Sequence, residues 1–215
     1  MFIDLHMHEK TYSLDSFLSL KEIVSIARQK GLDAICITDH DSMGLKEDAA
    51  RYGEEIGFPI FVGVEYYSLQ GDIVAFGIDD FPQERIPAQE FINMVKAQDG
   101  ICFSAHPFRN NNRGLEDNLS KVKGLDGVEV LNGSTSPEAN LEAVRYANAL
   151  NLITVATSDC HVLEKVGVYA TYFPKKVKTL EEFIAVFKEG NLKPAYYQDG
   201  GYHIWDMNQK LAVNM

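Results

Sequence analysis

The amino-acid sequence predicts an α/β fold, and two observations support this class. Short apolar runs of strand length alternate with segments of helix length whose apolar residues recur on one face. Strands that are joined through helices run parallel, because each helix carries the chain back to the edge where the strand began. About seven such units fit a distorted, seven-stranded, TIM-like β/α barrel better than an open sheet.

The first half of the chain alternates strand and helix regularly. Ser19 and Glu22 have the spacing of a capping box, and Gly31 ends the segment that follows, so this segment is predicted to be a helix. The predicted strands of this half cover residues 2–6, 33–38 and 59–65, and the predicted helices cover residues 19–31 and 44–57.

The pattern changes after residue 65. Residues 66–78 predict a β-hairpin about the turn Gln70-Gly71-Asp72. The alternation then resumes, and neither a repeat nor a linker interrupts it, so residues 1–215 are interpreted as a single domain. The later predicted strands cover residues 101–106, 127–131, 152–159 and 168–173, and the later helices cover residues 87–100, 116–124, 137–150 and 179–190.

Composition narrows the possible partners. The formal net charge is −11, and an acidic chain repels the phosphate backbone, so no nucleic acid is expected as a partner. Acidity suits cation binding if the carboxylates converge. The three cysteines do not make a disulfide framework, and the sequence has neither a signal peptide nor a membrane-spanning run. We therefore expect a cytoplasmic protein without membrane contact.

Histidines gather at the predicted carboxyl ends of strands. Five of the six histidines stand there, and His203 is the exception. Residues i and i+2 of a strand face the same side, so His6 and His8 can hold one ion together, and Asp159 and His161 repeat that spacing. In barrels of this type the active site gathers at these strand ends.

The converging side chains predict a metal centre. Imidazole together with carboxylate suits Zn²⁺, Mn²⁺ or Fe²⁺ rather than Ca²⁺. One ion takes about three to six protein ligands. The candidate ligands number eight, so two or three ions are expected. Asp15 is also typical of a helix cap, and His40 of a turn. The candidate ligands are His6, His8, Asp15, His40, Glu65, His106, Asp159 and His161.

Five short motifs resemble those of one known family. "DLHMH", "TDHD", "GVE", "AHP" and "SDCH" occur in this order between residues 3 and 161 and resemble the PHP (polymerase and histidinol phosphatase) family. The resemblance implies a distorted seven-stranded barrel that holds up to three metal ions and hydrolyses phosphoesters. It assigns metal-ligand roles to the same eight residues. It also implies a further His or Cys ligand before the last motif, where this chain offers only Glu129 and Asn132.

Residues near the predicted ligands suggest substrate contacts. Arg109, in "HPFRNNNRG", is placed to clamp a phosphate with its planar guanidinium, and Arg113 is a second choice. The alternative for Arg109 is a solvated loop arginine. Asp39, Asp41 and Asn132 are candidates for orienting imidazoles, with turn formation as the alternative.

The sequence therefore predicts a metal-dependent phosphoesterase acting on a monoester or diester. A metal-activated hydroxide would attack the phosphorus of a small phosphorylated metabolite or nucleotide, with Arg109 neutralising the growing charge. Two alternatives stay open. The same centre could hydrolyse a C–N or C–O bond in the manner of an amidohydrolase, or the chain could be a non-catalytic metal-containing regulatory module.

Overall fold

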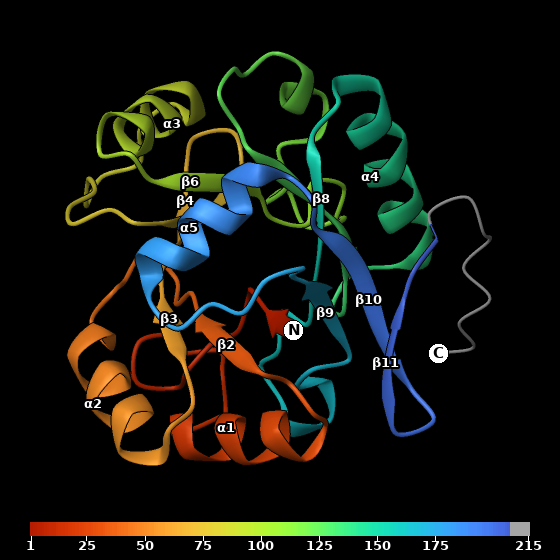
Figure 1. The fold of residues 1–215 in the computed structure, drawn as a ribbon. Coiled ribbons are helices and arrows are strands. Elements are labelled where there is room, and N and C mark those ends of the chain that lie inside the picture. Colours follow the sequence, from red (N-terminus) through yellow and green to blue (C-terminus); the bar gives the residue numbers. More distant parts are fainter. Residues whose placement is uncertain (207–215) are drawn as a thin grey trace.

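The computed structural model describes residues 1–206, and its strands form two sheets (Figure 1). The first sheet has six strands in the order β11-β10-β9-β1-β2-β3, and the second has five in the order β4-β5-β6-β7-β8. The strands are β1 Phe2–Asp4, β2 Ala34–Ile37, β3 Ile60–Val62, β4 Val64–Tyr67, β5 Asp72–Phe76, β6 Ile101–Ser104, β7 Gly127–Asn132, β8 Ile153–Thr157, β9 Tyr169–Tyr172, β10 Lys193–Gln198 and β11 Gly201–Ile204.

Strand directions follow the connections between strands. β1, β2 and β3 pair in parallel, and so do β6, β7 and β8. β4 and β5 form an antiparallel hairpin, as predicted, but the turn covers residues 68–71 and Asp72 already belongs to β5, where it pairs with Tyr67. β9 runs antiparallel to both β1 and β10. A mixed α/β fold is therefore confirmed, although its strands are not uniformly parallel.

The prediction of seven strands closed into a barrel is not confirmed. Residues 1–206 contain eleven strands, and no continuous backbone ladder joins the two sheets. At one junction the Thr171 hydroxyl accepts from the backbone N–H of Ala156 at 3.0 Å and donates to its carbonyl at 2.9 Å, in place of a ladder. At the other, Gly63 separates β3 from β4 within the predicted strand 59–65, and a Cβ there would lie 2.4 Å from the Ala75 carbonyl oxygen.

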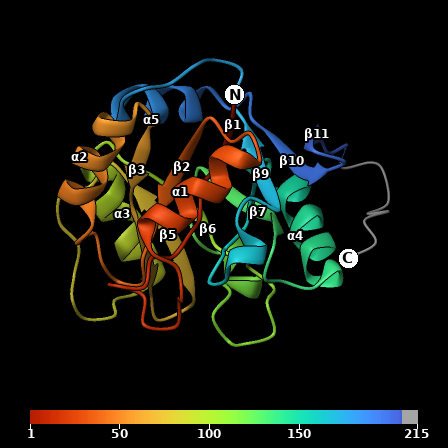
Figure 2. The same ribbon diagram turned by 90° about the horizontal axis from the view of Figure 1, so that it is seen from below.

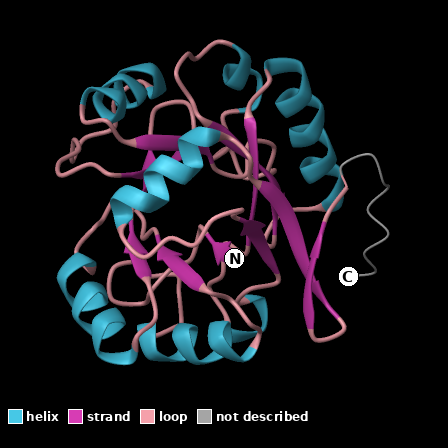
Figure 3. Cartoon of the chain, in the orientation of Figure 1, coloured by secondary structure: helices cyan, strands magenta, loops and turns pink. Residues whose placement is uncertain are grey.

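Helices lie around the outside of the sheets (Figure 3). Ser19 caps the first helix as predicted, because its side chain accepts from the Glu22 N–H while Glu22 accepts from the Ser19 N–H at 2.9 Å. The helix predicted over 116–124 is only a short 3₁₀ helix, η1. The helices are α1 Leu20–Gln29, α2 Lys46–Ile56, α3 Ala88–Ala97, η1 Glu116–Ser120, α4 Pro137–Leu150, η2 Leu163–Lys165 and α5 Leu180–Glu189.

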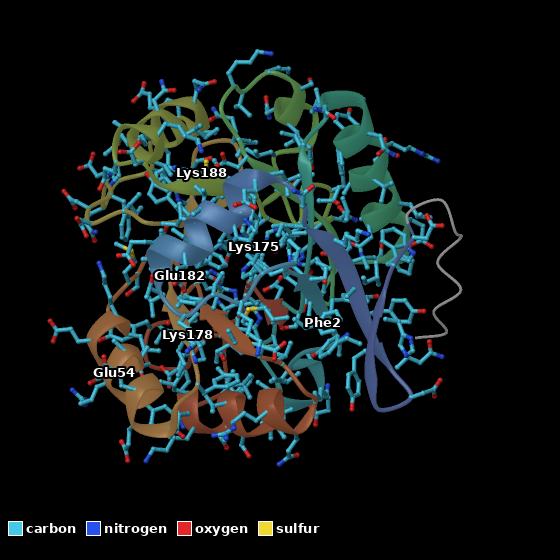
Figure 4. The ribbon with its side chains drawn as sticks, viewed as in Figure 1. Phe2, Glu54, Lys175, Lys178, Glu182 and Lys188 are labelled. Atoms are coloured by element: carbon cyan, nitrogen blue, oxygen red, sulfur yellow. The ribbon has the colours of Figure 1, made fainter. Side chains whose placement is uncertain are left out.

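One end of the strand assembly is closed by α5. Phe183 and Phe187 of this helix are fully buried against residues of both sheets, among them Ile3 of β1 and Phe103 of β6. The outer side of this end is charged: Lys178 and Glu182 are exposed and labelled beside α5 in Figure 4. Among the described residues, no helix is both long and apolar enough to cross a membrane.

Candidate metal centre

The candidate centre is built from segments of both sheets, at the end of the strands away from α5 (Figure 2). Most of its side chains are completely or almost completely buried. His6 and His8 follow β1, His40 follows β2, Glu65 lies in β4, His106 follows β6, and Asp159 and His161 follow β8. The structure thus brings together residues that are far apart in the sequence.

His6 and His8 face each other at the bottom of the centre, with their Nε2 atoms 3.0 Å apart. Oδ1 of Asp159 lies 3.2 Å from Nε2 of His8 and 3.7 Å from Nε2 of His6. The other ring nitrogen of His6, Nδ1, lies 2.7 Å from a carboxylate oxygen of Glu129. A carboxylate only accepts, so Nδ1 carries the proton and, in the neutral ring, Nε2 presents a lone pair to the centre.

His8 is oriented in the same way through a hydroxyl. Its Nδ1 lies 3.1 Å from Oγ of Ser13, and that hydroxyl donates to Oδ1 of Asp39 at 2.8 Å. Because the Ser13 proton goes to Asp39, Ser13 accepts from the His8 ring, and Nε2 of His8 is left as an acceptor. Asp39, a predicted orienting residue, therefore reaches the imidazole through Ser13, a residue that no sequence pattern singles out.

Glu65 lies at the middle of the cluster. Its Oε1 is 2.8 Å from Nε2 of His106 and 3.4 Å from Nε2 of His6. Its Oε2 is 3.6 Å from Nε2 of His8 and 2.6 Å from Nδ1 of His40. The 2.6 Å contact lacks the angles of a hydrogen bond, so both atoms are buried without a hydrogen-bond partner in the described part of the chain.

Asp15, His40 and His161 form the solvent side of the centre. Oδ2 of Asp15 lies 3.2 Å from Nε2 of His40 and 3.4 Å from Nε2 of His161. The Asp15 side chain is 61% exposed, against 24% for His40 and 22% for His161. The ring of His8 lies 4.3 Å from each of these two imidazoles, which connects the solvent side to the buried side.

The donor set fits divalent cations. Three groups of side chains each offer ligand atoms that lie within 4.8 Å of one another. The inner nitrogens of His6 and His8 are lone-pair donors that face carboxylate oxygens, so they are left unsatisfied unless a positive charge lies between them. The three groups are His8, His40 and His161; His6, His8 and Asp159; and Glu65, Asp72 and His106.

The pKa shifts of the buried histidines and of Glu65 also indicate a site that favours positive charge. Burial alone would lower the pKa of His6, but the carboxylates of Glu129, Asp159 and Glu65 outweigh it and raise that pKa well above its ordinary value. Burial lowers the pKa of the neighbouring His8 to about 3. Burial would raise the pKa of Glu65, yet the imidazoles around it hold that pKa well below its usual range.

Two acidic residues at the centre were not among the predicted ligands. Asp72 is completely buried at the first position of β5, with Oδ2 3.7 Å from Nε2 of His106. Its position beside Gly71 is typical of a turn residue. An acidic residue at the start of an apolar strand is nevertheless a signal that could have identified it as a candidate ligand. Glu129 uses both carboxylate oxygens, on Nδ1 of His6 and on the backbone N–H of His106 at 2.6 Å. It therefore orients other side chains.

Backbone strain is concentrated at this centre. Asp41, His106 and Asp159 have φ values of 47°, 27° and 48°. Residues other than glycine rarely take this left-handed conformation, and it costs on the order of 1 to 3 kcal/mol for each residue. The surrounding packing holds the chain in these conformations where it turns toward the cluster.

Both predicted arginines reach the centre from the loop after β6. Nη2 of Arg109 donates to Asp159 and to Oδ1 of Asn132 at 2.8 Å, and this side chain is 19% exposed. Nε and Nη2 of Arg113 donate to the two carboxylate oxygens of Asp72 at 2.6 and 3.0 Å. Neither is a freely solvated loop arginine.

The other predicted orienting residues contact different groups. Asn132 donates to Oε2 of Glu129 at 2.8 Å and to Oδ2 of Asp159 at 3.2 Å. Asp41 accepts from the backbone N–H of Tyr67 at 2.9 Å. Asn132 thus positions carboxylates, while Asp41 fixes the end of β4.

Comparison with known proteins gives one family model and three distant relatives. The family model described as PHP-associated matches residues 137–192, which include α4, β8 and β9. One of these relatives, an uncharacterised protein of Methanocaldococcus jannaschii, is 28% identical over 141 residues, which are 61% of this chain and 82% of that protein.

Solved structures share the fold at low sequence identity. A protein from Bifidobacterium adolescentis, assigned as a metal-dependent phosphoesterase, is 20% identical with a TM-score of 0.64, over 74% of this chain and 87% of that one. An amidohydrolase from Chromobacterium violaceum with bound sulfate is 18% identical with a TM-score of 0.66, over 92% of this chain and 98% of that one.

A third structure corrects the expectation that no nucleic acid is a partner. Endonuclease Q in complex with a 27-mer duplex, with an abasic lesion at the active site, matches with a TM-score of 0.62 and 17% identity. The match covers 89% of this chain and 57% of that one. Net charge is the sum of all charges on the protein, whereas a nucleic-acid strand is bound by the local charges at one site. The net charge of −11 therefore does not exclude nucleic acid.

Proposed function

We propose that this chain, which belongs to the PHP domain family, hydrolyses phosphoesters at a centre that holds two or three divalent metal ions. The observation that carries the proposal is the buried cluster of imidazoles and carboxylates flanked by two arginines. Lone-pair donors that converge in this way fit cations, and guanidinium groups beside them fit a phosphate.

The ligands fall into three groups around shared residues. His6, His8 and Asp159 would hold one ion, and Glu65 and His106 a second, with Asp72 as an added ligand. His40 and His161 would complete a third group with His8, with Asp15 close to both. Mixed imidazole and carboxylate donors suit Mn²⁺, Zn²⁺ or Fe²⁺.

When bound, such ions activate water as a nucleophile and neutralise charge on the phosphoryl oxygens. The chain's own residues position the reactants. Arg109, partly exposed beside Asp159, would bind the phosphoryl group and offset the charge that grows in the transition state. Glu129 keeps His6 in one tautomer, and Ser13 with Asp39 does the same for His8.

The substrate class that we propose is a phosphorylated metabolite or a nucleotide. The centre opens to solvent on the side of Asp15, His40 and His161, so a phosphate on a larger molecule can approach from there. The guanidinium of Arg109 next to this opening favours an anionic reacting group over a neutral amide.

We place this activity in the cytoplasm. Cys36, Cys102 and Cys160 are buried and free, as expected in a reducing compartment. Burial raises the pKa of each thiol, so none is activated as a nucleophile.

Hydrolysis of a C–N bond is the second candidate. The C. violaceum structure is called an amidohydrolase, and the same donor set could activate water against a carbonyl. A neutral substrate would gain nothing from Arg109, which is why we rank this reaction below phosphoester hydrolysis.

The first experiment measures metal content and turnover together. The purified protein is analysed for bound metal, and then tested with Mn²⁺, Zn²⁺ or Fe²⁺ on phosphomonoesters, phosphodiesters and amides. We expect two or three ions per chain and release of phosphate, with both lost in His6→Ala and Glu65→Ala.

A matched variant controls for the loss of a histidine. His203 is exposed on β11, so His203→Ala should retain metal content and turnover. Bound metal with turnover of amides alone would favour the second candidate. Bound metal without turnover would favour a regulatory module, and absence of metal under all loading conditions would refute the metal centre.

A further inference from the structure

We propose that Arg85, Tyr67 and Arg113 form a second anion-binding subsite, which holds another phosphate of the same substrate. The proposal rests on the proposed phosphoesterase function and specifies the substrate class. It is carried by the contacts of these three side chains, which lead outward from Asp72 at the edge of the centre.

Tyr67 connects the subsite to the centre. It is the last residue of β4, two positions after Glu65, so the two side chains lie on the same face of the strand. Its partner in the hairpin is Asp72, and its backbone N–H is held by Asp41 at 2.9 Å. The half-buried Tyr67 ring is therefore fixed just outside the metal-ligand cluster.

Arg113 is the inner cation of the subsite. Two nitrogens of its guanidinium bind the two carboxylate oxygens of buried Asp72. The carbon of the same guanidinium lies 4.4 Å from the centre of the Tyr67 ring. A guanidinium has five N–H donors, so this pairing leaves donors for a substrate oxygen on a side chain that is 30% exposed.

Arg85 is the outer cation, and its backbone is held on both sides. The buried hydroxyl of Tyr66 donates to the carbonyl oxygen of Glu84 at 2.5 Å and accepts from the N–H of Ile86 at 3.0 Å. The Tyr66 ring is itself stacked on Phe91 at 4.1 Å. The loop between β5 and α3 is thus fixed at the residues next to Arg85.

The guanidinium of Arg85 faces the Tyr67 ring and has no acidic partner. Its carbon lies 3.6 Å from the ring centre, and no ion pair is formed by this side chain within residues 1–206. Stacking occupies the flat face of a guanidinium and leaves its N–H edges free, which is the geometry that phosphate recognition uses. An exposed, oriented cation without a carboxylate is available to an anion.

The spacing and charge indicate one substrate with two phosphates. The two guanidinium carbons are within about 8 Å of each other, because each lies within 4.4 Å of the Tyr67 ring centre. In a chain of net charge −11, Asp72 offsets the charge of Arg113, so Arg85, which forms no ion pair within residues 1–206, supplies the net positive charge on this ring beside the centre. The second phosphate could belong to a bisphosphorylated metabolite or to the next nucleotide of a strand.

The test compares pairs of ligands in which one member carries one phosphate and the other carries two. One pair is butyl phosphate and butane-1,4-diyl bisphosphate, and the other is thymidine 5′-phosphate and the 5′-phosphorylated dinucleotide pTpT. We expect Arg85→Met to lower the preference in kcat/KM for the two-phosphate member by roughly tenfold or more, since a charge-assisted hydrogen bond is lost. The pair that shows the loss identifies the source of the second phosphate.

Three further variants separate a specific role from general damage. Tyr67→Phe keeps the ring and should keep the preference, whereas Tyr67→Leu should lose it. Arg51 is an exposed arginine on α2, paired with Asp48, so Arg51→Met should leave the preference and the activity unchanged. A preference that is equal in wild type and Arg85→Met for both pairs would overturn the proposal.

A binding measurement keeps the subsite independent of turnover. Butylphosphonate and butane-1,4-diylbis(phosphonate) have C–P bonds that are not hydrolysed as esters, so calorimetry on the metal-loaded protein reports affinity alone. Tighter binding of the bisphosphonate that is lost in Arg85→Met supports the subsite even if no phosphoester is hydrolysed. Equal affinity in both proteins, with phosphoesters hydrolysed, would refute the subsite and retain the proposed function.

Discussion

The two ends of the strand assembly have opposite chemistry. At the α5 end, aromatic rings pack together, with Phe183 5.1 Å from Phe76 and Phe187 6.0 Å from Phe103. At the other end, the imidazoles of His6, His8 and His106 and the carboxylates of Glu65 and Asp159 are equally buried. Burial of rings stabilises the fold, whereas burial of charged groups opposes it unless they are paired.

The comparison indicates that the fold separates stability from chemistry. β1 and β6 start among the phenylalanines and lead to His6 and His106 at the metal-ligand cluster, so the apolar end can offset the unfavourable burial and backbone strain at the other. Substitutions at the two ends should therefore have different effects. Those at the cluster should reduce activity, and those at the phenylalanine end should reduce the free energy of unfolding.

The largest effect is expected from Glu65→Gln. This change keeps the shape of a side chain whose oxygens approach four imidazoles but removes its charge, so kcat/KM should fall by about 10³- to 10⁴-fold. Steady-state kinetics and metal content measure the loss. Glu55→Gln, on the exposed side of α2, should change neither. A drop in melting temperature as large as that of a core variant would show that the two ends are not separable.

Phe183→Ala should have the converse effect. Its ring is fully buried among Phe61, Phe76 and Phe173, so removal should destabilise the protein by about 4 kcal/mol. Urea unfolding measures the change, and kcat of the folded fraction should remain close to that of wild type. Phe17→Ala is the matched control, because the Phe17 side chain is 76% exposed and its loss should cost little. A large loss of kcat in folded Phe183→Ala would contradict the separation.

Glu129→Gln tests the residues that orient the ligands. The amide can still contact Nδ1 of His6 but lacks the charge that fixes its tautomer, so kcat/KM should fall by about 10- to 100-fold. A titration with Mn²⁺ should show that weaker metal affinity accounts for part of this loss. Glu138→Gln, exposed in the first turn of α4, is the control. An effect as large as that of Glu65→Gln would make Glu129 a ligand rather than an orienting residue.

The sequence predicted the local elements well, because their signals are local. The capping box at Ser19 and Glu22 and the turn at Gly71 were confirmed, since each depends on residues a few positions apart. The histidines at strand ends were likewise readable from spacing, and the structure brings them together. Asp72 was missed because its burial depends on its distant contacts with Arg113 and His106.

Whether the sheets close into a barrel could not be predicted from the alternation of strands and helices along the sequence. Whether two neighbouring strands form a hydrogen-bonded ladder depends on how their edges are placed relative to each other. The sequence pattern of each strand carries no information on this placement. At β8 and β9 the edges are joined by the Thr171 side chain, which reads in the sequence as an ordinary strand threonine. The expectation about nucleic acid was wrong for a related reason, because net charge carries no information on where charges lie.

The smallest effect is expected from Thr171→Val, which tests this junction between the two ends. Valine keeps the shape of the side chain but leaves the N–H of Ala156 without its acceptor, so the protein should lose about 1 to 2 kcal/mol. Thr171→Ser retains the hydroxyl and should recover most of this loss in urea unfolding. Because Thr171 is completely buried in β9, beside β8 and away from the ligands, kcat should stay unchanged in both variants. A fall in kcat would mean that the junction positions Asp159 at the end of β8, so that stability and chemistry are coupled there.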